Sequence, residues 1–326
     1  MFAPLFGAVK EFSMNDTALS ASAGATHPRR WLIPLALATV YVVWGSTYLG
    51  IRYGLTGFPP FVLAGLRFGA AGVAMYAWLR LRGAPAPTKL QWRNAAITGV
   101  LLLAFGNGLV CFAEEYVASG VAAVAIASEP LFVAVVLCAY REWPRRVEVI
   151  GLIVGFIGVV LLNSGSALRA SPWAAIALLV ATAAWAFGSI WSRRQDMPKG
   201  PMNVAAQMLC AAPALGLMAL ASGERLPGHV PAQSVIALAY LAIFGSIIAF
   251  SAYLFLLRAV RPALSSSYAY VNPPVAVLIG VLFAGEHVGG LELAGMMVIL
   301  LGVALITLAR VRNTIPTPTL PLKGRQ

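Results

Sequence analysis

The feature that most constrains this chain is a succession of ten apolar segments, each between 17 and 24 residues long. At 1.5 Å per residue, a helix of about 20 residues crosses the roughly 30 Å hydrocarbon core of a bilayer. The segments are 32–51, 59–79, 95–113, 119–140, 147–163, 172–192, 201–221, 234–257, 264–284 and 291–309. Hydrophobic residues make up 60% of the 326 residues and charged ones only 10%, which no soluble domain can bury. The pattern predicts an all-α polytopic membrane protein.

The distribution of cations predicts how such a protein is oriented. Ten crossings put both termini on one side, and cytoplasmic loops are enriched in Lys and Arg. With both termini in the cytoplasm, 19 of the 23 Lys and Arg residues fall on the inner side. Arg52, Arg169 and Arg225 fall on the outer side, and Arg67 lies within the second segment. The sequence therefore predicts an N-in/C-in arrangement.

The two halves of the chain repeat each other at a spacing of about 143 residues. Gly45-Ser46 falls on Gly188-Ser189, and Glu129-Pro130 falls on Asn272-Pro273. Each half contains five segments, an odd number, so the second half must cross the membrane upside down relative to the first. This predicts two inverted five-helix repeats, an arrangement typical of secondary transporters.

The repeats define the predicted domains. Residues 31–163 form the first repeat and residues 172–311 the second. Residues 1–30 are expected to be a disordered cytoplasmic leader, because their apolar run is too short for a good signal peptide. Residues 312–326 contain three prolines and no apolar run, and are expected to be a disordered tail.

Glu129 lies near the middle of the fourth segment, at the depth of the bilayer midplane. A carboxylate there costs on the order of 2.5 kcal/mol or more unless it is protonated, paired or hydrated, so it marks a candidate functional site. Three roles are open: it couples transport to protons, it binds a cationic substrate, or it stays protonated and hydrogen-bonded to Asn107 or Ser46. Pro130, and in the second half Pro273 and Pro274, predict flexible or broken points in their helices.

Small and polar residues on shared helical faces extend this site. We expect Asn107, Asn272, Ser46, Thr47, Ser189 and Tyr268 to line a substrate or proton pathway, with polar groups offered to a small solute. The alternative is that they only hydrogen-bond packed helices to one another. Arg67 either pairs with a carboxylate, binds an anionic substrate group, or extends to the outer interface.

Other classes of protein fit the sequence less well. The net charge of +12 is spread over short loops, which argues against nucleic-acid binding. The three cysteines lie in apolar segments without metal-ligand spacing, and no catalytic residue, metal site or cofactor is predicted. The expected partners are a small-molecule substrate and membrane lipid, and the protein is expected to be a monomer or homodimer.

Several motifs together resemble a known family. They are Trp44-Gly45-Ser46-Thr47, Gly65-Leu-Arg67, Gly106-Asn107-Gly108, Trp185-Ala-Phe-Gly188-Ser189, Tyr268-Ala-Tyr270-Val-Asn272-Pro273, and the Pro130–Glu142 and Pro273–Glu286 spacings. Over residues 31–311 the chain resembles the EamA family of the drug/metabolite transporter superfamily, in its YedA-type branch. The resemblance implies a ten-helix exporter with a central cavity. Relatives often carry an uncharged residue where Glu129 stands, so the resemblance implies no charge coupling.

These observations predict a secondary transporter that exports a small metabolite, amino acid or drug-like solute by alternating access, with proton coupling as one option. Abundant Arg, Ala and Gly suggest a bacterial inner membrane. A channel or facilitator is the alternative, but inverted repeats with paired proline breaks favour alternating access over a standing pore. An intramembrane enzyme is disfavoured because all three histidines lie outside the helix cores, and a scaffold because no soluble module is present.

Overall fold

The described part of the protein is built from helices. The computed structural model describes residues 31–117, 119–162 and 171–284, with parts of 290–305. Within these ranges every regular element is a helix, which confirms the prediction of an all-helical chain. Six continuous helical spans are long and apolar enough to cross a membrane. They are Leu32–Leu55, Pro60–Leu81, Lys89–Ala113, Pro172–Ser192, Pro201–Ala221 and Ala232–Ala259.

Prolines set the starts of several helices, where a missing N–H costs nothing. Helix α3 (Pro60–Leu81), helix α9 (Pro172–Ser192) and helix α10 (Pro201–Ala221) each have Pro in the first turn. Gly200, which precedes α10, has a φ of 53°, a backbone conformation that favours glycine. Helix α2 (Leu32–Leu55) is the first described helix.

Two of the spans contain π-helical stretches at comparable places in the two halves. Helix α4 (Lys89–Gly99) continues into η2 (Val100–Gly108) and then α5 (Leu109–Ala113). Helix α11 (Ala232–Tyr240) continues into η3 (Leu241–Ala249) and then α12 (Phe250–Ala259). Stretches of π-helix are rare and are frequent at functional sites.

Two other segments are interrupted. The segment predicted at 119–140 is divided into α6 (Ser119–Ile126) and α7 (Glu129–Ala139), and the turn between them falls directly before Glu129. The segment predicted at 264–284 is divided into α13 (Pro262–Ser265) and α14 (Tyr268–Ala284). This second interruption lies upstream of Pro273 and Pro274, which are inside α14.

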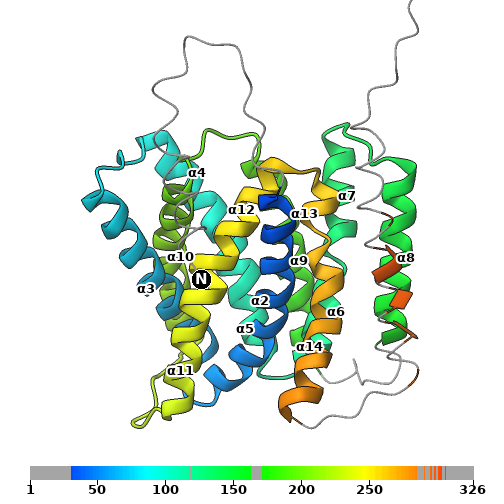
Figure 1. Cartoon of the computed structure of the whole chain (residues 1–326). Coiled ribbons are helices and arrows are strands. Elements are labelled where there is room, and N and C mark those ends of the chain that lie inside the picture. The colour runs from blue at the N-terminus through cyan, green and yellow to red at the C-terminus, as the bar shows by residue number, and fades with distance from the viewer. Residues whose placement is uncertain are drawn as a thin grey trace, which may run out of the picture.

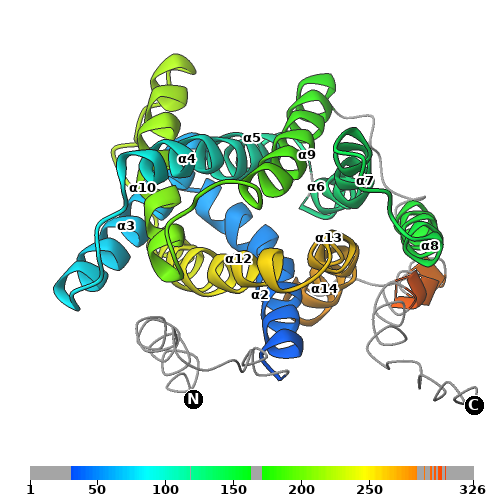
Figure 2. The same cartoon turned by 90° about the horizontal axis from the view of Figure 1, so that it is seen from above.

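The helices run side by side in one bundle (Figure 1). Seen from above (Figure 2), α2 extends through the bundle beside α12 and α14, and it packs against both. Helix α9 packs against η2, α6 and α7, and α3 packs along α10. Helix α8 (Arg146–Leu162) lies at the edge of the bundle in both views.

The surface of the bundle is apolar. Trp173, Leu220, Leu217 and Val135 are each at least 67% exposed. Exposed apolar faces of this kind are stable when they face lipid, whereas the buried interior of the bundle holds charged groups that include Arg67 and Glu129. The predicted leader 1–30, the tail 312–326 and most of the last segment, 291–309, lie outside the described residues.

Candidate functional site

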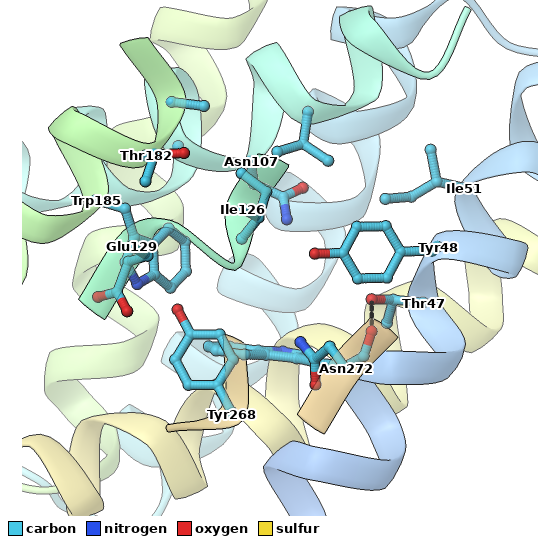
Figure 3. Close-up of a pocket in the computed structure, with 14 residues that line it drawn as sticks. Thr47, Tyr48, Ile51, Asn107, Ile126, Glu129, Thr182, Trp185, Tyr268 and Asn272 are labelled. Carbon is cyan, nitrogen blue, oxygen red and sulfur yellow. Dashed lines mark hydrogen bonds between the residues drawn. The ribbon is translucent and has the colours of Figure 1, made fainter. Parts of the chain in front are cut away.

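A small pocket lies in the centre of the bundle, where elements of both halves meet. It encloses about 60 Å³, room for a few water molecules. It is lined by the aromatic residues Trp44, Tyr48, Trp185 and Tyr268, by the polar residues Thr47, Asn107, Glu129, Thr182 and Asn272, and by Ile51, Gly106, Val110, Ile126 and Ala181. Figure 3 shows side chains from α2, α9 and α14 converging on it. Small-molecule sites are usually about 300 Å³ or more, so this volume is below that of a typical ligand site.

Glu129 is the only charged residue among those that line the pocket. It is 1% exposed, and neither carboxylate oxygen has a hydrogen-bond partner within the described part of the chain. Glu129 is the first residue of α7, where the helix dipole favours negative charge. Tyr253, Tyr268 and Tyr270 lie within electrostatic range of it. Within the described residues, the acid in the pocket therefore has no hydrogen-bond partner.

A cluster of aromatic rings forms one wall beside Glu129. The centroid of the Trp44 ring lies 5.4 Å from that of Trp185 and 4.8 Å from that of Tyr268, both in edge-to-face geometry. Tyr253 packs against all three of these rings. In Figure 3 the Glu129 carboxylate lies beside the Trp185 ring, at the same end of the pocket as the Tyr268 hydroxyl.

Hydrogen bonds fix these rings. The Trp44 indole N–H donates to the carbonyl of Gly245 at 3.1 Å, and the Trp185 indole N–H donates to the Tyr253 hydroxyl at 3.1 Å. The Tyr253 hydroxyl also pairs with Ser189 at 2.6 Å. Because the N–H groups of Trp44 and Trp185 are occupied, these two rings offer the pocket their apolar and π-electron surfaces.

Arg67 lies behind the pocket and joins the two π-helical stretches. It is 2% exposed, so it does not extend to a surface. Its Nε donates to Ser246 of η3 at 2.7 Å, and its Nη1 donates to the side-chain oxygen of Asn107 of η2 at 3.3 Å. In the described part of the chain Arg67 makes no salt bridge, and Glu114 is within its electrostatic range. Arg67 thereby positions Asn107, which lines the pocket.

A second cavity, of about 550 Å³, is lined by later residues of α7, beginning with the residue after Glu129. Pro130 lines it, together with Glu148 and Arg261. The carboxylate of Glu148 accepts two hydrogen bonds from Arg261, one of them, from Nη2, at 2.8 Å. A second ion pair joins Glu142 to Arg194 at 2.6 Å. Both pairs connect the first half of the chain to the second.

The structure brings together five of the eight residues predicted for the pathway. Glu129, Asn107, Asn272, Thr47 and Tyr268 all line the pocket. The three that do not line it are tied to neighbouring helices: Ser46 pairs with Tyr240 at 2.5 Å, Ser189 with Tyr253, and Arg67 with Ser246. Among the described residues, neither Asn107 nor Ser46 hydrogen-bonds Glu129.

Sequence reasoning did not assign Trp44, Tyr48, Thr182 or Trp185 to the site. Two signals were available for them. Trp44 and Trp185 belong to the motifs quoted above, and Thr182 corresponds to Thr39 at the repeat spacing of 143 residues. Tyr48 adjoins Thr47 on the same helix, but nothing in the sequence indicates that it faces the pocket.

The apolar helices are those of a multi-pass membrane protein, and a pocket with polar residues lies at the centre of the bundle. The chain belongs to the EamA-like transporter family, whose model matches it twice, over residues 31–164 and 172–308. This confirms the resemblance described from the motifs, and it makes the chain a membrane transporter and not an enzyme.

Individual relatives agree. The chain is 45% identical over 287 residues to an uncharacterized inner membrane transporter, YedA of Escherichia coli (strain K12), covering 86% of this chain and 93% of the relative. It is 27% identical over 264 residues to protein PecM of Dickeya dadantii, covering 79% and 86%. One solved crystal structure matches with a TM-score of 0.70 at 22% identity, covering 87% of this chain and 99% of the other, which shows a shared fold.

Proposed function

We propose that the protein is a secondary transporter that exports a small solute across the inner membrane by alternating access between its two halves. The observation that carries this proposal is the pocket itself, which is lined by residues of both halves and holds an acid without a hydrogen-bond partner in the described part of the chain. The inner-membrane location is proposed by similarity to the relative from Escherichia coli. The proposed topology is ten helices in two inverted five-helix repeats, with both termini in the cytoplasm.

The size of the pocket favours alternating access over a standing pore. A cavity of about 60 Å³ cannot hold a metabolite, so a substrate enters only when the halves separate. The elements beside the pocket offer suitable points of movement. The turn at 127–128 lies between α6 and α7, and the turn at 266–267 lies between α13 and α14.

We propose that Glu129 couples this movement to protons. Burial disfavours the charged form of an acid, and the groups within electrostatic range of Glu129, Tyr253, Tyr268 and Tyr270, are neutral phenols. A change in hydration between the two open states would therefore load and release one proton. Asn272, its counterpart in the repeat, cannot titrate, so only one half carries the proton.

Counterflow in proteoliposomes tests the transporter function. Vesicles loaded with a high concentration of an unlabelled substrate should transiently accumulate the labelled form above its external concentration, and the initial rate should saturate. A channel gives neither result. Vesicles without protein are the control, and uptake that stays linear with concentration and shows no counterflow would overturn the proposal in favour of a channel.

A further inference from the structure

The chemistry of the pocket indicates which class of solute it binds. We propose that the substrate is a small organic cation: an ammonium group with an apolar substituent and at least one hydrogen-bond donor. This inference rests on the proposed transport function and adds the substrate class. It is carried by three observations: the unpaired acid, the ring surfaces beside it, and the kind of polar atom that lacks a partner.

The first observation is that Glu129 has no cationic partner among the residues that the structure describes. The nearby Arg67 donates to Ser246 and to Asn107 and does not line the pocket. Arg193 donates to the carbonyl of Val260 at 3.2 Å. A buried carboxylate is stable when paired with a positive charge, and here that charge is supplied by a ligand.

The second observation is the aromatic wall. Trp44, Trp185 and Tyr268 line the pocket with Glu129, and the ring hydrogen bonds described above hold Trp44 and Trp185 in place. A cation over the face of Trp or Tyr is attracted by the π-electrons, and quaternary ammonium ligands are recognised in this way. The rings also bury the apolar substituents of an ammonium group, which a point charge such as a metal ion lacks.

The third observation concerns the fully buried polar side-chain atoms of the residues that line the pocket. Those without a hydrogen-bond partner in the described chain are both oxygens of Glu129 and the side-chain oxygen of Asn272. All three accept hydrogen bonds. A ligand with N–H or O–H groups satisfies them, whereas a carboxylate or phosphate adds acceptors and leaves them unpaired.

An anionic or zwitterionic substrate therefore fits poorly. Its negative group would need a free cation, and Arg67, the buried guanidinium nearest the pocket, is turned to Ser246 and Asn107. Glu114 is buried and within electrostatic range of Arg67. Among the described residues that line the pocket, Glu129 is the one that can carry a charge.

Matched ligands test the inference. Binding to the purified protein in detergent would be measured by calorimetry and by quenching of tryptophan fluorescence for choline, its neutral carbon isostere 3,3-dimethylbutan-1-ol, and the zwitterion glycine betaine. Benzyl(2-hydroxyethyl)dimethylammonium extends the series to a larger apolar group and keeps the hydroxyl donor. We expect the better-binding of the two cations to bind at least about tenfold more tightly than the neutral and the zwitterionic ligands.

Variants assign the preference to the pocket. In Glu129→Gln the cation should bind no more tightly than the neutral isostere. In Trp185→Phe the ratio of the two dissociation constants should shrink by a few-fold. Glu115→Gln changes an exposed acid, and Trp92→Phe changes a tryptophan that packs on Tyr76 and does not line the pocket; both should bind like wild type. If Glu129→Gln does not fold, the comparison of ligands on the wild-type protein still decides.

Each outcome has one meaning. Equal binding of cation and isostere, tighter binding of betaine, no binding of either cation, or an unchanged cation preference in Glu129→Gln would overturn the cation proposal. Counterflow of a neutral or anionic solute, in a protein that binds neither cation, would also overturn the cation proposal, but the transport function would stand. Cation binding that depends on Glu129, in a protein that shows no counterflow, would overturn the transport function and leave the binding site.

Discussion

The two halves of the chain match the same family model yet contribute differently to the pocket. The first half supplies the acid Glu129, at the start of a helix that follows a turn. The second half supplies the amide Asn272 at the corresponding place, inside the helix α14 that begins at Tyr268. The difference teaches that a repeated fold can hold an asymmetric site, in which one half carries the charge and the other supplies a neutral acceptor.

The largest expected effect tests that asymmetry. Glu129→Gln keeps the shape of the side chain and removes its titration, so proton-driven accumulation should fall by about tenfold or more, equivalent to at least 1.4 kcal/mol. Asn272→Ala removes only a neutral acceptor and should lower accumulation less. The measurement is uptake into proteoliposomes with an imposed pH gradient.

A second result would end the coupling proposal. Undiminished uphill transport in Glu129→Gln that still follows the pH gradient would mean that another group carries the proton. Equal losses in the two variants would mean that the halves are functionally equivalent despite their different side chains.

The next effect concerns how firmly the halves are joined. The carboxylate of Glu148 is 5% exposed and accepts from Arg261 and from the backbone N–H of Arg145, whereas the side chains of the Glu142–Arg194 pair are 60% and 28% exposed. Glu148→Ala removes charge-assisted hydrogen bonds to a buried carboxylate, although the Arg261 side chain is 43% exposed and can bond to water instead, and should lower the free energy of unfolding by about 1–3 kcal/mol. Glu142→Ala should cost about 0–1 kcal/mol, as exposed pairs do.

Thermal unfolding of the two variants in the same detergent measures this difference. The unfolding midpoint of Glu148→Ala should be lower than the midpoints of Glu142→Ala and of the wild type. A midpoint for Glu148→Ala equal to that of Glu142→Ala would show that the buried ion pair does not hold the halves together.

An effect of similar size separates the two partners of Arg67, one from each half. Ser246→Ala removes the 2.7 Å bond to Nε and should lower the unfolding free energy by about 1–3 kcal/mol. Asn107→Ala removes a longer bond of 3.3 Å and should destabilise less, but it should slow transport more because Asn107 lines the pocket. Unfolding and counterflow are measured on both variants. Ser246→Ala should lose more stability, and Asn107→Ala should lose more transport. If the same variant were the more impaired in both assays, this expectation would be wrong.

The sequence alone could predict an all-helical membrane protein and its family, and six of the ten predicted spans are found as continuous helices among the described residues; of the site it could predict only part. Long apolar segments mark membrane helices because backbone groups in lipid must bond within their own helix, and the acid at midplane depth marked Glu129. The π-helical stretches were not predicted, because no residue pattern here distinguishes them from α-helix. Nor could the partner of Arg67 be foreseen, since Ser246 is 179 residues away and meets it only through helix packing.

The aromatic wall shows the same limit. Trp44 and Trp185 could be read as motif residues, but their contact joins helices from different halves. Periodicity gives the face of each helix, and it does not give the rotation of one helix relative to another. The small and polar residues predicted to share helical faces therefore fall into two groups. Some line the pocket, such as Thr47, and others hydrogen-bond a neighbouring helix, such as Ser46.

The smallest expected effect distinguishes the prolines of the two halves. Pro130 lies in the first turn of α7, where no backbone hydrogen bond is lost, whereas Pro273 lies inside α14 and removes one. Pro273→Ala should therefore stiffen its helix and slow counterflow by roughly two- to threefold, an effect of less than about 1 kcal/mol, and Pro130→Ala should slow it less.

Pro213→Ala, in the interior of α10 and outside both cavities, is the matched control and should transport like wild type. Initial counterflow rates at equal expression provide the measurement. Unchanged rates in a variant that replaces both Pro130 and Pro273 would show that the halves move about other points, with the turns at 127–128 and 266–267 the next to test.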